Sequence, residues 1–164
     1  MRDFGKGSFS LRQAPRPARL VYGAFVVFAA LGFATQLGFV LGRIGVSPVA
    51  IAAYYRGGES GDAMTFPKTF GQLLDITHAH AFVMGIVFLV LAHLFLSTSA
   101  PARLKAAALV ASFAGTFGDL LAPWLVRYGA AWCAWILIVS WAAEAGGYTV
   151  ILVVTGRECV GPDG

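Results

Sequence analysis

Four long apolar segments alternate with short polar connections along the chain. Their approximate bounds are 20–41, 73–96, 104–126 and 130–154. A helix rises 1.5 Å per residue, so about 20 residues cross roughly 30 Å of hydrocarbon, and every segment reaches that length. An isolated segment in lipid must satisfy its own backbone hydrogen bonds, which a helix does. The pattern therefore predicts an all-α integral membrane four-helix bundle, with residues 1–164 forming a single transmembrane domain.

The three connections predict how the helices are joined. Residues 42–72 form the longest connection, which we expect to cap one end of the bundle. Residues 127–129 are so few that the last two helices must form a tight antiparallel hairpin. Small residues allow close approach of helices in lipid. The positions predicted to lie at such helix contacts include Gly38, Gly42, Gly115, Gly118 and Gly147.

Composition agrees with a membrane protein. The chain is 58% hydrophobic and 12% charged, with a mean hydropathy of +0.74, whereas about 25% of residues are charged in soluble domains. The surface is therefore expected to contact membrane lipids. The formal net charge is +4, but the basic residues lie at the ends of the apolar segments and form no stripe, so nucleic acid is not an expected partner.

The positions of the basic residues predict the orientation. Lys and Arg are enriched in cytoplasmic loops, and eight of the twelve lie on the side of the two termini. Both termini are therefore predicted to be cytoplasmic, with residues 42–72 periplasmic, in a bacterial inner (plasma) membrane. The four basic residues on the other side are Arg43, Arg56, Lys68 and Arg127.

Ionisable residues inside the apolar segments are the candidates for function. Each costs about 2.5–3.5 kcal/mol at a helix centre on insertion scales, so each needs a compensating partner. All three histidines of the chain lie in the second segment. The intramembrane polar residues singled out are Gln36, Asp75, His78, His80, His93, Asp119 and Glu144.

Helix geometry predicts which of these residues can meet. His78 and His80 point about 200° apart, so they face different neighbours, whereas His78 and His93 lie about 60° apart on one stripe. Equal depths predict a cluster of Gln36 and Asp119 with either His78 or His80. Which of the two histidines faces the interior is left open by the sequence.

Two further pairings follow from spacing and depth. Asp75 lies one turn before His78 and can accept a hydrogen bond that fixes its tautomer. Glu144 lies deeper in the bundle and is predicted to pair with His93 toward the inner side.

Heme b binding is the first functional hypothesis. Imidazole is a common axial ligand of heme iron, and His78, His80 and His93 lie inside the membrane. The four-span layout and the segment Thr77-His78-Ala79-His80 loosely resemble small b-type cytochrome membrane subunits. The resemblance implies a subunit of a redox or respiratory-type complex, passing electrons between quinol or quinone and a periplasmic cytochrome. Arg56, Lys68 and Arg127 would then neutralise the heme propionates.

Two other hypotheses remain open. Copper or zinc could be held by His78, His80, Asp119 and Met84, since thioether suits Cu(I) while imidazole and carboxylate suit Zn²⁺ or Cu(II), and the same polar residues could instead pass protons. The chain could also be a structural accessory subunit of a larger membrane complex or a homo-oligomer. No motif of a stand-alone enzyme is evident.

Overall fold

Four long helices form the molecule, and they confirm the all-α four-span fold. The structure is a computed structural model that describes residues 10–60 and 63–161. The four helices long and apolar enough to cross a membrane are Arg16–Ile44, Phe70–Leu96, Ala102–Gly129 and Ala131–Val160. Each contains the segment predicted from the sequence or nearly all of it. Their regular α-helical parts are α1 (Arg16–Phe39), α3 (Phe70–Leu96), α4 (Ala102–Trp124) and α5 (Ala134–Val160).

The long connection between α1 and α3 folds into a cap, as predicted, and contains two elements that were not predicted. These are α2 (Pro48–Arg56) and a small antiparallel hairpin of β1 (Gly58–Ser60) and β2 (Ala63–Thr65). The Ser47 hydroxyl accepts a hydrogen bond of 3.1 Å from the backbone N–H of Ala50, and Pro48 follows in the first turn, so α2 starts here. Gly57 ends α2 with a φ of 81°, which favours glycine.

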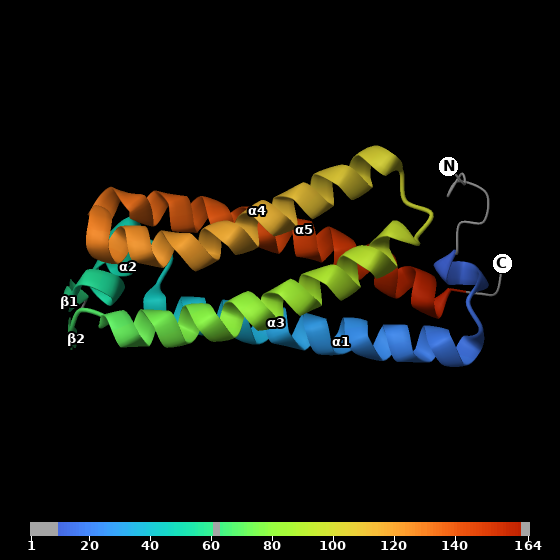
Figure 1. The fold of residues 1–164 in the computed structure, drawn as a ribbon, viewed down its shortest axis with the longest axis horizontal. Helices are drawn as coiled ribbons and strands as arrows, with labels where there is room; N and C mark the ends of the chain where they lie inside the picture. Colours follow the sequence, from blue (N-terminus) through green and yellow to red (C-terminus); the bar gives the residue numbers. More distant parts are fainter. Residues whose placement is uncertain (1–9, 61–62, 162–164) are drawn as a thin grey trace.

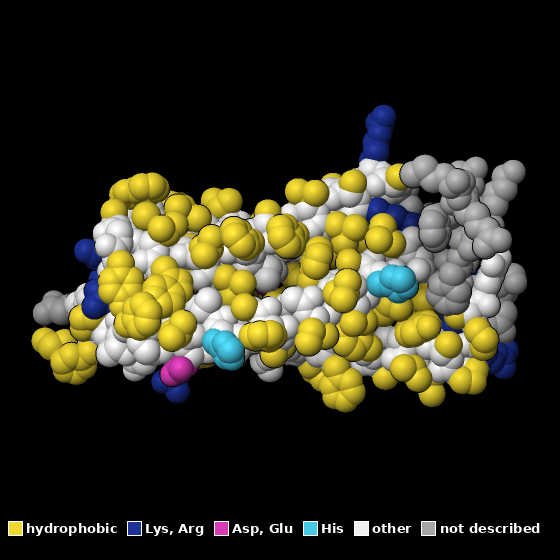
Figure 2. Space-filling view, viewed as in Figure 1, with side chains coloured by type: hydrophobic (Ala, Val, Ile, Leu, Met, Phe, Trp, Pro, Cys, Tyr) yellow, Lys and Arg dark blue, Asp and Glu magenta, His cyan; other side chains and the backbone are white. Residues whose placement is uncertain are grey.

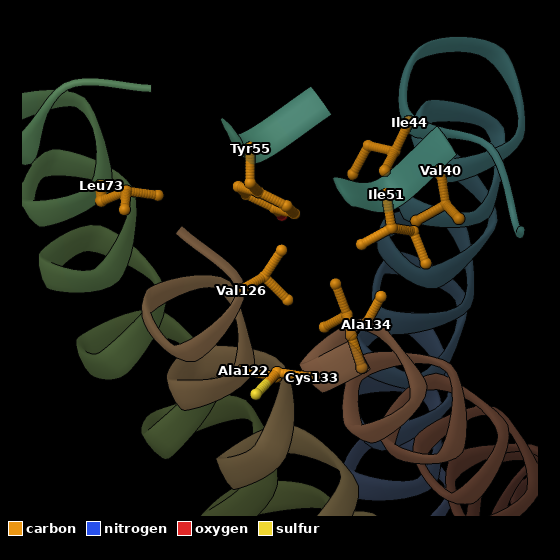
Figure 3. Packing of buried hydrophobic residues seen from close by; sticks show 10 residues of the cluster. Val40, Ile44, Ile51, Tyr55, Leu73, Ala122, Val126, Cys133 and Ala134 are labelled. Carbon is orange, nitrogen blue, oxygen red and sulfur yellow. The ribbon is translucent and has the colours of Figure 1, made fainter. Parts of the chain in front are cut away.

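Hydrophobic side chains attach the cap to the bundle. Ile51 and Tyr55 are buried on the inner face of α2, where they pack with Val126 of the turn that follows α4 and with Ala134 of α5. Figure 3 shows Ile51 and Tyr55 pointing from α2 into the space between the long helices. Arg56 adds a polar contact, because one nitrogen of its guanidinium donates to the carbonyls of Val126 and Gly129, both at 3.0 Å.

Small residues bring α4 and α5 into backbone contact. A Cβ added to Gly115 would lie 2.5 Å from the backbone nitrogen of Glu144, and one added to Gly147 would lie 2.7 Å from that of Ser112. The predicted contacts of Gly115, Gly118 and Gly147 are thus confirmed. The prediction for Gly38 and Gly42 is wrong within the described chain, since nothing lies within 4 Å of an added Cβ at either.

The other end of the bundle is closed by the segment before α1. Leu11 is fully buried, and its backbone N–H donates to the Ser97 carbonyl at 2.9 Å. Glu158, near the end of α5, accepts a hydrogen bond of 2.7 Å from the backbone N–H of Ser99 and forms an ion pair of 3.6 Å with Arg12. Figure 1 shows that α1 begins and α5 ends at this same end, opposite the cap.

Candidate ligand site beneath the cap

A cavity of about 430 Å³ lies between the long helices directly beneath α2. All four long helices and the cap contribute to its wall. Its rim includes the exposed residues Phe39 of α1 and Ile76 of α3, so the cavity opens between these two helices onto the lateral surface of the bundle. The polar side chains in its wall that matter for binding are Gln36, Tyr55, His80, Asp119 and Trp141.

The predicted cluster of Gln36, His80 and Asp119 is therefore brought together, with His80 as its histidine. Asp119 lies in the last quarter of α4, and its Oδ1 accepts a hydrogen bond of 2.6 Å from the Trp141 indole. Its other oxygen has no hydrogen-bond partner among residues 10–60 and 63–161. His80 lies close enough to interact electrostatically with this carboxyl group.

His80 is held in one tautomer by its own helix. Its Nδ1 lies 2.9 Å from the Ile76 carbonyl oxygen one turn earlier. A carbonyl can only accept, so Nδ1 must carry the hydrogen. In the neutral ring, Nε2 then holds a lone pair, and it has no partner within the described part of the chain. His80 can therefore accept a hydrogen bond from a ligand or coordinate a metal.

Tyr55 forms part of the roof of the cavity. Burial and, to a lesser extent, the negative charge of Asp119 raise the pKa of its hydroxyl well above the usual value. Tyr55 therefore remains a neutral phenol, which can donate a hydrogen bond, at physiological pH. The sequence did not single out Tyr55, because it belongs to the cap, whose position over the bundle depends on tertiary packing.

The other residues of the second span face elsewhere. His78 is exposed and packs edge-on against Phe82 with ring centroids 5.2 Å apart, and Asp75 is exposed without a hydrogen bond to it in the described structure. The pairing predicted for Asp75 and His78 is therefore not formed. His93 is exposed near the far end of α3. Figure 2 shows histidine side chains lying among hydrophobic ones on the outer surface of the bundle.

The four residues predicted to hold copper or zinc are not gathered at one place. His80 and Asp119 line the cavity, whereas His78 faces outward and Met84 packs into a separate apolar cluster with neighbours such as Leu91. Among the described residues, no group of three or more His, Cys, Asp or Glu side chains could hold a metal ion.

The three basic residues assigned to propionates contact neutral groups at the capped end. Arg56 binds the backbone carbonyls described above. The Arg127 Nε donates to the Lys68 carbonyl at 2.7 Å, and the Lys68 ammonium lies 4.2 Å from the centre of the Tyr54 ring. These contacts hold the cap to the bundle, and the propionate role stays a prediction.

Glu144 lies in a second cavity of about 450 Å³ between α1 and α5. Its Oε1 accepts a hydrogen bond of 3.3 Å from Thr116, whose hydroxyl is also 3.3 Å from that of Tyr148. The predicted pairing of Glu144 with His93 is wrong, because α4 supplies the partner. The two cavities share three wall residues, Gln36, Val40 and Trp141.

The polar residues of α5 follow a signal that the sequence carries. Ser140, Glu144 and Tyr148 are spaced four residues apart, and all three are buried. Such spacing places side chains on one helix face. This pattern indicates which face of α5 packs against α4, where Thr116 lies.

Comparison with family models matches residues 45–163 to one family, described as a transmembrane helical domain. The chain belongs to the Aq_1264_TM family. The family match begins after α1 and includes the cap, α3, α4 and all of α5. No curated protein and no solved structure matches the chain. None of the comparisons shows a resemblance to b-type cytochrome subunits.

Proposed function

We propose that this Aq_1264_TM protein is a membrane subunit of a redox complex and binds the head group of a lipid-soluble quinol or quinone beneath its cap. The observation that carries the proposal is the cavity in which His80 and Asp119 meet. Binding sites for small molecules are mostly apolar, with a few polar groups that fix orientation. The wall of this cavity is likewise mostly apolar, with a few polar side chains such as His80 and Asp119.

The position of the cavity suits a ligand that diffuses within the bilayer. Its mouth lies between α1 and α3, where Phe39 and Ile76 are exposed on the lateral surface. A head group can enter sideways through this mouth while its hydrocarbon tail stays in lipid. A water-soluble ligand would instead have to pass α2 and the buried side chains beneath it.

The polar groups match both oxidation states of such a head group. A quinol hydroxyl can donate to Nε2 of His80 or to the free oxygen of Asp119, while a quinone carbonyl can accept from the Tyr55 hydroxyl or the Gln36 amide. Oxidation of quinol releases two protons and two electrons. His80 and Asp119 are placed to accept the protons, and the two electrons would pass one at a time to two molecules of a one-electron heme protein, such as a periplasmic cytochrome.

Binding of decylubiquinone to the purified protein tests this proposal. Quenching of tryptophan fluorescence reports binding, and because Trp141 lines both cavities, occupancy of the first is the part of the quenching that responds to variants of His80 and Asp119. We expect His80→Ala and Asp119→Asn each to weaken binding about tenfold, the loss of one good hydrogen bond. His78→Ala is the matched control, because His78 lies on the same helix outside the cavity, and it should bind like wild type. Equal affinity in all variants, or no binding to wild type, would refute the proposal.

Heme b is a second candidate, favoured by the hydrogen bond between Nδ1 of His80 and the Ile76 carbonyl. Metal-binding histidines usually donate their other ring nitrogen in this way. A Soret band in the purified protein that is lost in His80→Ala and kept in His78→Ala would assign heme to this cavity. A colourless protein that binds decylubiquinone would favour the first proposal.

A further inference from the structure

Glu144 is nearly inaccessible to solvent, yet it lines a cavity that opens toward lipid. The side chain is 3% exposed. The cavity lies between α1 and α5, and its wall includes the exposed residues Leu37 and Ala145. Its mouth is thus on a different face of the bundle from that of the first cavity, which opens between α1 and α3.

Among the described residues, no cation lies beside Glu144. The wall of the second cavity, as these residues form it, contains no Lys, Arg or His. An unpaired carboxylate in apolar surroundings costs several kcal/mol, so the group takes up a proton instead. The surroundings of Glu144 therefore favour its neutral carboxylic acid form.

The hydrogen-bond chain assigns the proton to one oxygen. The Tyr148 hydroxyl can donate to Thr116, and Thr116 donates to Oε1 of Glu144. When Thr116 donates to Oε1 in this way, Oε2 is the oxygen that carries the hydrogen of the neutral acid. Oε2 has no hydrogen-bond partner in the described structure. Among the described residues, the side-chain atoms that are both unpaired and inaccessible to solvent are Thr155 Oγ1 and Glu158 Oε2. Oε2 of Glu144 is unpaired but is not one of these, so it keeps some accessible surface, which faces the cavity.

We propose that the second cavity is a separate binding site for a lipid-soluble molecule with a carbonyl head, and that the Glu144 hydroxyl donates the hydrogen bond that anchors it. An unpaired O–H donor in apolar surroundings gains more from one acceptor than a solvated donor does. Glu144 lies near the middle of its span, Ala131–Val160, at a depth that favours the carbonyl of a quinone or long-chain ketone over the ester groups of phospholipids at the membrane surface. The two cavities share Gln36 and Trp141 in their walls, but the anchor proposed here, Glu144, has no part in the proposed function, and the inference does not rest on that function.

Labelling with dicyclohexylcarbodiimide, followed by mass spectrometry of the intact full-length protein and its peptides, tests the state of Glu144. This lipid-soluble reagent takes the acid proton onto one nitrogen while the carboxyl oxygen bonds to its central carbon. The adduct then rearranges to a stable N-acylurea that contains all atoms of both reactants. We expect Glu144 to be labelled several-fold more than Glu158.

Glu158 is a matched internal control. It lies on the same helix and is also 3% exposed, but it faces Arg12 at 3.6 Å and accepts from Ser99. It therefore has a cationic partner, which Glu144 lacks among the described residues, and we expect it to react more slowly with the carbodiimide. Both carboxyl groups are compared in one sample, so differences in folding or reagent concentration cancel. Absence of label on Glu144, or equal label on both residues, would overturn the proposal.

Protection from labelling tests the ligand class. Decylubiquinone, which carries carbonyl acceptors, should slow the labelling of Glu144 several-fold, whereas decane, which fills apolar space without an acceptor, should not. The slowing should persist in His80→Ala, or in Asp119→Asn if the first variant does not fold. No slowing, equal slowing by decane, or slowing that disappears in these variants would each overturn the second site. Failure of quinone binding at His80 alone would leave this result unchanged.

Discussion

The hydroxyl of Tyr55 shows how the cap sets the chemistry of a single residue. Tyr55 is buried in the roof of the first cavity and faces the charge of Asp119. Both effects disfavour the phenolate, so the neutral form is specifically stabilised by folding. A group whose folded-state pKa is raised contributes stability below its unfolded pKa, and this contribution is lost as the pH rises toward the folded value.

This linkage predicts the behaviour of Tyr55→Phe in alkali. Below the ordinary tyrosine pKa of about 10, wild type and variant should differ by a constant amount. Above it, wild type should lose stability faster, because only wild type must keep the Tyr55 phenol protonated to stay folded. Thermal midpoints measured in detergent at several values from pH 8 to about pH 11 check this. Parallel curves across the whole range would contradict the burial of the hydroxyl near Asp119.

For single residues, the sequence predicts the depth of a side chain along its helix, but not the direction in which the rotation of that helix points it. Counting residues from the helix ends correctly placed Gln36, His80 and Asp119 at one level. Rotation of α3 then decides between His78 and His80, and it depends on packing, for example on the 2.8 Å hydrogen bond from Trp124 to Thr77. Helix period alone carries no information about that contact.

At the scale of elements, the contact of α4 with α5 positions the polar pair Glu144 and Thr116. Gly115 allows α4 to approach the backbone of Glu144, and this closeness puts Thr116 within reach of the Glu144 carboxyl. In lipid, such packing replaces the hydrophobic effect as the force between helices. A side chain inserted at this contact should therefore disturb both the hairpin and the second cavity.

Two adjacent glycines of α5 allow a matched test. A Cβ at Gly147 would lie 2.7 Å from the Ser112 nitrogen and 2.8 Å from the Ala108 carbonyl oxygen, whereas a Cβ at Gly146 meets nothing within 4 Å. We expect Gly147→Ala to lower the free energy of unfolding by about 1–3 kcal/mol, as overpacking does. Gly146→Ala should change it by less than about 1 kcal/mol and in the stabilising direction. Unfolding in increasing sodium dodecyl sulfate measures both, and equal stabilities would disprove the contact.

The elements differ in how far the sequence specifies them. The four spans follow from length and hydropathy, because lipid imposes both. For α2 the signals are only local, in Ser47, Pro48 and Gly57, and they lie within a connection whose length permits many conformations. The segment before α1, which closes the uncapped end, is equally hard to predict from the sequence. The burial of Leu11 depends on a surface that α3 and α5 form together.

At the scale of the whole molecule, the two ends of the bundle differ in their basic residues. At the capped end, Arg56, Lys68 and Arg127 hold carbonyls or an aromatic ring, so these charges are part of the fold. At the other end, Arg103 and Arg157 are exposed beside the connection of α3 to α4 and the end of α5. The positive-inside rule counts Lys and Arg that flank the spans. Eight of the twelve lie, along the sequence, on the side of the two termini, which favours placing the uncapped end in the cytoplasm.

Cysteine accessibility tests this orientation directly. Cys133 and Cys159 are both buried and can be replaced by alanine to give a background without thiols. In that background, Met64→Cys places a thiol on the cap, where Met64 is 73% exposed, and Arg103→Cys places one at the opposite end. A membrane-impermeant maleimide added to spheroplasts should label the cap cysteine at once and Arg103→Cys only after the membrane is permeabilised. The reverse order would place the first cavity on the cytoplasmic side, and a periplasmic cytochrome could then no longer be the electron acceptor.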